Sequence, residues 1–101
     1  MKAHSMQFTV LTRRKTEQFS EAQFAPLLEA EANRVRQLYA EGFIRQIWAR
    51  GDMAGACQLV EASSENEVRE KLHSLPLHQA GMLELMALVP LKPYRAFCPQ
   101  T

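Results

Sequence analysis

The five residues GDMAG, at positions 51–55, divide the chain into two halves that have the same order of elements. Two glycines and an aspartate favour a chain reversal. The segments on either side, residues 43–50 and 56–62, have the β-branched and aromatic content typical of strands. We therefore expect a β-hairpin at the centre of the chain. One strand and one helix precede it in the sequence, and one helix and one strand follow it.

The first and last strands of the chain are predicted from the alternation of apolar and polar residues. Residues 6–13 place Met6, Phe8 and Val10 on one side, as a half-buried strand requires. Residues 82–91 form the last strand. Its helix-facing side is expected to carry Leu83, Leu85, Ala87 and Val89, and its other side Glu84, Met86 and Leu88.

A helix-start signature precedes the first helix. Ser20 is the expected N-cap with Gln23 three residues later, and Phe19 and Phe24 are spaced as a hydrophobic staple. Pro26 either interrupts this helix or begins the main helix. An apolar stripe then continues to a glycine at position 42, where we expect a left-handed C-terminal residue.

The second helix is predicted from a capping box, Ser64 with Glu67, followed by a short apolar stripe. We expect this helix to stop at Pro76, and residues 75–81, LPLHQAG, to form a loop.

Composition restricts the class of protein. A length of 101 residues with 47% apolar content predicts one domain over residues 1–101, with a core at about 6–91 and a C-terminal arm at 92–101. A net charge of +1 argues against nucleic acid as a partner. The absence of an apolar run of about 20 residues argues against a membrane span and predicts a cytoplasmic protein. Cys57 and Cys98 have no metal-ligand spacing and are expected to be ordinary thiols.

The order βαββαβ predicts an α+β fold of the ferredoxin-like type, with a four-stranded antiparallel sheet and two helices on one face. The other face is then uncovered and too apolar for water alone. It is expected to carry Thr9, Leu11, Ile44, Trp48, Met86 and Leu88. A second copy of the chain, bound through a two-fold contact, would cover it as a homodimer. The alternative is a monomer whose tail folds back over the sheet.

Several side chains are candidates for acid–base chemistry. Glu31 lies at the edge of the first helix's apolar stripe, where burial would raise its pKa and make it a base, or it is a surface residue that pairs with Arg34. His78, in the predicted loop, and His73 can move a proton near neutral pH, or are simply solvated. Tyr39 either donates a proton or packs. His4, near the N-terminus, carries no functional prediction.

Arg45, Trp48 and Glu84 are candidates for binding. Arg45 suits an anionic oxygen in a partly dry site. Regular strand geometry points Arg45 and Trp48 to opposite faces, so both contact one ligand only if the strand is bulged. Trp48 is alternatively a core or interface residue. Glu84 either pairs with a basic residue across a dimer contact or has a functional role.

The middle of the chain resembles the muconolactone isomerase family. The resemblance rests on EGFIRQIWARGD, the short strand after it, the SSENEV helix and LPL, in the same order and at similar spacing, and it covers residues 28–97. It implies a dimeric α+β barrel that assembles into dimers and larger rings. It also implies an isomerase of aromatic catabolism that shifts a proton in an unsaturated lactone without cofactor or metal.

The family's site residues carry over in part. Arg45 and Trp48 match its Arg-x-x-Trp, Glu31 matches a helix glutamate, and residues 75–77 match its Leu-Pro-Leu. Four family positions differ. They are a basic residue replaced by Ala32, a histidine replaced by Gln46, an arginine replaced by Ala49, and an aromatic stretch replaced by HQAG. These differences favour a different substrate or no isomerase chemistry, since fold alone does not determine function.

Two classes of function follow. In the first, the protein is a cofactor-independent isomerase of a small unsaturated lactone or oxo-acid, in which Arg45 holds an anionic oxygen and Glu31 or His78 relays the proton. The substrate would then contact Trp48, Tyr39 and Leu77. In the second, it is a non-catalytic dimeric module that binds a small hydrophobic ligand or supports a neighbouring enzyme.

Overall fold

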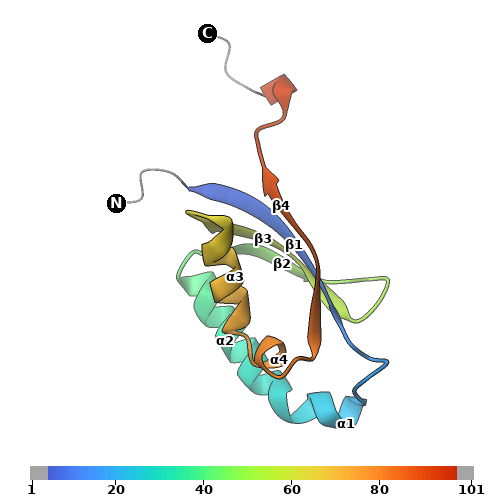
Figure 1. The fold of residues 1–101 in the computed structure, drawn as a ribbon. Helices are drawn as coiled ribbons and strands as arrows, with labels where there is room; N and C mark the ends of the chain where they lie inside the picture. The colour runs from blue at the N-terminus through green and yellow to red at the C-terminus, as the bar shows by residue number, and fades with distance from the viewer. Residues whose placement is uncertain (1–4, 98–101) are drawn as a thin grey trace.

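The computed structural model describes residues 5–97 and shows a four-stranded antiparallel sheet with its helices packed against one face (Figure 1). The strand order is β2-β3-β1-β4, which confirms the predicted ferredoxin-like α+β fold. The elements are β1 Met6–Arg14, α1 Glu21–Phe24, η1 Ala25–Leu27, α2 Leu28–Ala40, β2 Ile44–Ala49, β3 Gly55–Ala62, α3 Glu65–His73, α4 Pro76–Gln79, β4 Leu83–Leu91 and η2 Arg95–Phe97.

The helix start at Ser20 forms as predicted. The Ser20 hydroxyl accepts a 3.3 Å hydrogen bond from the Gln23 N–H, and the Gln23 side chain accepts one of 2.8 Å from the Ser20 N–H. Phe19 and Phe24 pack edge to face with ring centroids 6.1 Å apart. Pro26 lies in the 3-10 segment η1 between α1 and α2, so the interrupted helix is the alternative that the structure adopts.

The predicted ends of the two longer helices are also observed. Gly42, the residue after the C-cap of α2, has a φ of 88°, a conformation that glycine adopts without strain. The Ser64 hydroxyl accepts from the Glu67 N–H at 3.1 Å. The Glu67 carboxylate reaches back to Ser63, whose N–H and hydroxyl each donate at 2.7 Å, so the return half of this capping box is displaced by one residue.

The prediction of a loop over residues 75–81 is wrong, because Pro76 begins the short helix α4. Proline suits the first turn of a helix, where its missing N–H would have no intrahelical partner. Pro76 therefore both follows the end of α3 and starts a new helix. His78 lies in α4 instead of in a loop.

A β-bulge reverses the predicted faces of part of β4. Leu11 of β1 pairs with Ala87 and Thr12 pairs with Leu85, so Met86 is an extra residue in the ladder. Beyond the bulge, Leu88 packs against the core. Val89 is 47% exposed. The predictions that Val89 faces the helices and that Leu88 faces outward are wrong for this reason.

A second irregularity lies in β2. Ile44 pairs with Val60 and Gln46 with Leu59, which leaves Arg45 as the extra residue. Ile44 is consequently buried in the core, whereas Trp48 is 53% exposed. The prediction that Ile44 shares the open face with Trp48 is wrong.

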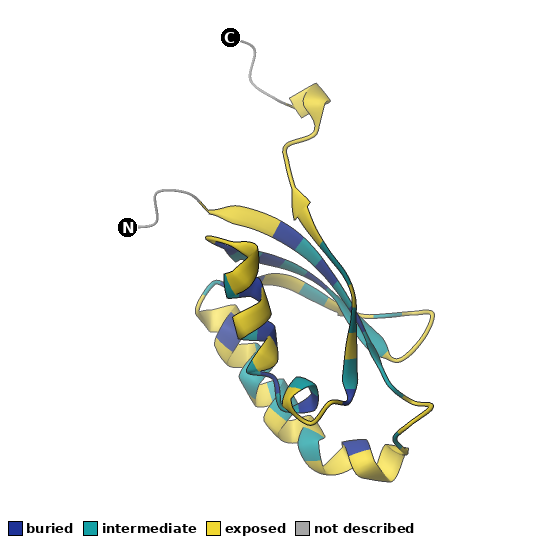
Figure 2. Ribbon diagram, viewed as in Figure 1, coloured by how far each residue is buried: buried dark blue, intermediate teal, exposed yellow. Residues whose placement is uncertain are grey.

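The core lies between the sheet and the helices, where Figure 2 shows the buried residues concentrated. One cluster is centred on Phe8, Val10, Leu38, Val60 and Leu72. A smaller one, which consists of Phe24, Leu77 and Met82, lies at the α1 and α4 end. Nothing in residues 5–97 forms a helix with the length and apolar character that a membrane span needs.

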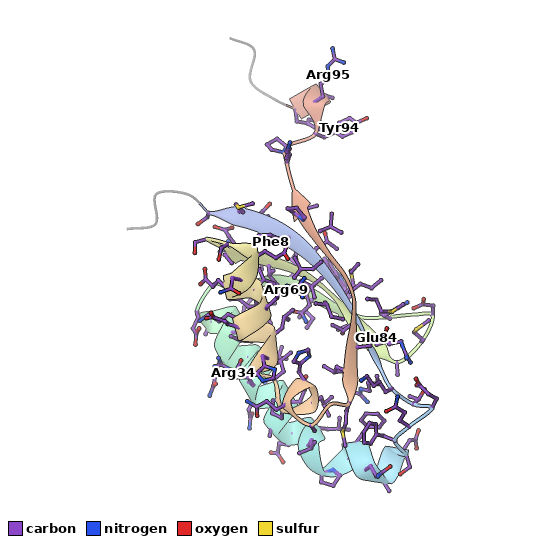
Figure 3. The ribbon with its side chains drawn as sticks, in the orientation of Figure 1. Phe8, Arg34, Arg69, Glu84, Tyr94 and Arg95 are labelled. Atoms are coloured by element: carbon purple, nitrogen blue, oxygen red, sulfur yellow. The ribbon has the colours of Figure 1, made fainter. Side chains whose placement is uncertain are left out.

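The C-terminal arm extends away from the domain in its described part, residues 92–97. Tyr94 and Phe97 are 75% and 82% exposed, and Tyr94 and Arg95 lie well beyond the sheet (Figure 3). This part of the arm therefore does not fold back over the sheet. Residues 98–101, which include Cys98, and His4 lie outside the described residues. Cys57 has a free thiol.

Candidate functional site

A pocket of about 280 Å³ lies where α2 and α4 meet the helix-facing side of the sheet. Its apolar walls come from both layers. They include Val35, Ile47, Leu75, Leu77 and Leu83. Its polar side chains are Thr12, Arg14, Glu31 and Gln58. Apolar walls with a few convergent polar groups are typical of small-molecule sites.

Glu31 is held in this pocket by α4. Its Oε1 accepts a 2.9 Å hydrogen bond from the N–H of Leu77, which belongs to the first turn of α4 and has no intrahelical acceptor. Burial raises the pKa of the Glu31 carboxyl, while the Leu77 N–H and the charge of Arg14 oppose this shift. The alternative partner, Arg34, instead bonds Ser74 at 2.9 Å.

Arg14, at the end of β1, supplies the positive charge of the pocket. Its guanidinium lies 5.6 Å from the centroid of the Phe24 ring, which is a cation–π contact. Among residues 5–97, no carboxylate forms an ion pair with Arg14. This cation is therefore available to an anionic ligand.

Gln58 and Thr12 are the polar residues of the sheet floor. They are 3% and 4% exposed. The Thr12 hydroxyl donates to the Ala56 carbonyl at 3.5 Å. Gln58 Oε1 is buried and has no hydrogen-bond partner within residues 5–97. Buried polar atoms without a partner are rare, so this oxygen is an unusual feature of the pocket.

The structure brings together three of the predicted site residues. Glu31, Trp48 and Leu77 all line this pocket, and the strand register directs the Trp48 side chain to the opposite, open face of the sheet. Arg45 lies at the opposite end of β2, in a smaller pocket with Glu41, Glu61 and Lys71 among its lining residues.

The other two predicted site residues lie apart from Glu31. His78 lines a third pocket with His73, and their rings pack edge to face with centroids 5.3 Å apart. Burial, the nearby His73 and Lys15 lower the pKa of His78. Tyr39 is 61% exposed on α2.

Sequence reasoning missed Arg14, Thr12 and Gln58. The signal for the first two was present, because they continue the helix-facing alternation of Phe8 and Val10 along β1. Gln58 shares that face through its pairing with Val10. Glu84, for which the sequence left open a pairing across a dimer contact or a functional role, accepts a hydrogen bond from Arg13 Nε of its own chain. Figure 3 shows Glu84 on β4.

Comparison with known families identifies the family of this chain. A family model described as muconolactone delta-isomerase matches residues 6–96. The chain belongs to the muconolactone delta-isomerase family. The resemblance found from the sequence over residues 28–97 is thereby confirmed and extended to β1.

A solved structure shows the same fold as this muconolactone delta-isomerase family member. It is 5-chloro-2-hydroxyhydroquinone dehydrochlorinase from Burkholderia phenoliruptrix AC1100, in complex with 2,5-dihydroxybenzoquinone. The TM-score is 0.62 at 19% sequence identity, and the match covers 86% of this chain and 92% of that chain. Among curated proteins, none matches this sequence.

Proposed function

We propose that this protein is a cofactor-independent isomerase that moves a proton within a small unsaturated lactone or oxo-acid, with Glu31 as the base. The observation that carries the proposal is the Glu31 carboxylate. It lies half-buried in an apolar pocket, with its pKa raised by burial, in a chain of the muconolactone delta-isomerase family. A base whose pKa lies closer to neutral pH transfers protons in both directions more readily.

The proposed reaction needs one base and no electron acceptor. Glu31 takes a proton from a carbon next to the carbonyl-conjugated system, and the C–H electron pair moves into the ring as a dienolate. The double bond shifts when the same carboxyl returns the proton to another carbon. One C–H bond breaks and one forms, so atoms and electrons balance.

Arg14 is the cation best placed to hold the anionic end of such a substrate. Its charge acts on Glu31 across the same pocket, and no carboxylate in residues 5–97 neutralises it. Guanidinium binds carboxylate and enolate oxygens well in partly dry sites. Arg45 and His78 of the same chain line other pockets. Their catalytic roles stay predictions, and the role proposed for Arg14 is independent of them.

We also propose that the open face of the sheet pairs with a second copy of the chain. The strand register places a row of apolar side chains there. They are Leu11, Trp48, Cys57, Leu59, Ala87 and Val89. A symmetric contact would bury this face in both copies. The assignments to the cytoplasm and to aromatic catabolism belong to this proposal as well.

The dehydrochlorinase structure with the same fold supports a small oxygenated ring as the ligand. Its bound molecule, 2,5-dihydroxybenzoquinone, is such a ring. A pocket of about 280 Å³ with apolar walls and an arginine suits a ligand of similar size.

The test is isomerisation of muconolactone by the purified protein, followed by NMR as the double bond changes position. We expect turnover without added metal or cofactor. Binding of the lactone without any change in its double bond would contradict the isomerase and favour the non-catalytic ligand-binding module.

A further inference from the structure

Gln58 is a polar side chain in an apolar position. In the β-ladders of β3 it lies opposite Val10 on one side and Ile47 on the other, and it is 3% exposed. An aliphatic side chain would satisfy the packing of this position. The amide instead introduces a buried carbonyl oxygen, Oε1, at a residue that lines the pocket containing Glu31.

That oxygen has no donor from the described chain. The Thr12 hydroxyl donates to the Ala56 carbonyl at 3.5 Å. The Leu77 N–H donates to Glu31. Residues 5–97 leave Gln58 Oε1 buried and unpaired. Buried polar groups are paired in nearly all folded proteins, so the missing donor points to a group that arrives from outside the chain.

The chemistry of the pocket restricts what that group is. Arg14 can only donate hydrogen bonds, and it is satisfied by a carboxylate or a carbonyl of the ligand. Gln58 Oε1 can only accept. A ligand that carries acceptors alone, such as a simple unsaturated lactone acid, would fill the pocket and still leave Gln58 unpaired.

We propose that Gln58 selects a hydroxylated ring ligand, by accepting a hydrogen bond from an enol or phenol O–H on the ring. The ligand class is therefore a small ring acid or ring ketone that carries at least one free hydroxyl. This inference rests on the proposed function in using the same pocket, and it predicts that a hydroxylated member of that substrate class binds more tightly than muconolactone, which carries no ring hydroxyl.

The experiment is a binding comparison by calorimetry that needs no turnover. The ligands are benzoate, meta- and para-hydroxybenzoate, and the two matching methoxybenzoates. The proteins are the wild type, Gln58→Leu and Gln58→Met, with Gln79→Leu on the exposed end of α4 as the matched control. The methoxy compounds keep the oxygen as an acceptor but remove the donor.

We expect one hydroxybenzoate to bind the wild type about tenfold more tightly than benzoate, since a buried hydrogen bond has an effect of this size. The preference should disappear in Gln58→Leu and Gln58→Met and persist in Gln79→Leu. Two substitutions at the site keep the test decisive if one of them fails to fold.

Four results would overturn the inference. The first two are no hydroxyl preference in the wild type and a preference that survives both Gln58 substitutions. The other two are tighter binding of a methoxy compound than of its hydroxy counterpart and failure of every ring acid to bind. Glu31→Gln separates this inference from the proposed function, because it should lower the rate of isomerisation by about 10²–10⁴-fold and retain the hydroxyl preference.

Discussion

The carboxylate of Glu31 on α2 accepts a 2.9 Å hydrogen bond from the backbone N–H of Leu77 on α4. The bond joins two residues that are 46 positions apart in sequence and lie on different helices. It also fixes the carboxylate in an apolar pocket without a direct ion pair among the described residues. The Leu-Pro-Leu sequence makes this possible, since Pro76 starts α4 and leaves the next N–H free to donate.

Replacing Glu31 with glutamine should change how stability depends on pH. Burial raises the pKa of Glu31 in the folded state, so the folded protein binds this proton more tightly than the unfolded chain. The wild type therefore loses stability as pH rises from the unfolded pKa through the folded pKa. Glu31→Gln lacks this loss and keeps an acceptor for the Leu77 N–H.

The measurement is the melting temperature of Glu31→Gln relative to wild type between about pH 4 and pH 7. We expect the melting temperature of the variant to increase relative to that of the wild type as pH rises. Glu29→Gln, on the exposed side of the same helix, should show no such trend. A difference that moves in favour of the wild type would mean that the charged form of Glu31 stabilises the fold.

His78 should titrate below its ordinary range, and His73 should be part of the reason. Burial lowers the pKa of His78 first, followed by repulsion from His73 and Lys15. Because the folded state disfavours the proton, stability is lost as pH falls through the unfolded pKa toward the folded one. NMR titration of His73→Gln should show a higher pKa for His78 than in the wild type. An unchanged or lower value would contradict the coupling of the two rings.

Gly55 should not tolerate a side chain. A Cβ at this position would lie 2.2 Å from the carbonyl oxygen of Thr12 and 2.9 Å from Cα of Arg13, so the β1–β3 pairing would have to move. We expect Gly55→Ala to lower the free energy of unfolding by about 1–3 kcal/mol, as overpacking does.

Gly51→Ala is the control for this change, because nothing lies within 4 Å of a Cβ there. Its effect should stay within about 0.5 kcal/mol. Urea unfolding measures both. Equal effects of the two substitutions on the free energy of unfolding would show that the close approach of β1 does not exclude a side chain at position 55.

The open sheet face should control the oligomeric state. Trp48 is 53% exposed on that face, and Trp48→Glu would place a charge within the proposed contact between two copies. We expect sedimentation analysis to give a dimer for the wild type and a monomer for this variant. Tyr39→Glu, on a 61% exposed residue of α2, should remain a dimer. A monomeric wild type, or a dimeric Trp48→Glu, would contradict the proposed interface.

Much of the fold is predictable because its signals are local. The capping residues Ser20 and Ser64, the glycine at position 42 and the alternation of β1 each act within a few residues of sequence. The bulges at Arg45 and Met86 are different, since each depends on the register of a strand pair. A strand pattern read alone therefore assigns the wrong face beyond the bulge.

The candidate site was predictable only in part for a related reason. Glu31 was identified from its position at the edge of a helical stripe, and Leu77 from the family resemblance. Arg14 and Gln58 join them only after β1, β3 and α2 pack together. Nothing in the sequence near Gln58 indicates that its carbonyl lacks a donor, because that property belongs to the assembled pocket.

The most direct test of the central claim is the rate of muconolactone isomerisation by Glu31→Gln, with Glu29→Gln as the control on the same helix. Loss of the base should lower kcat by about 10²–10⁴-fold while binding of the lactone is retained. The control should match the wild type. A Glu31→Gln variant that keeps the wild-type kcat would contradict the assignment of Glu31 as the proton-transferring residue.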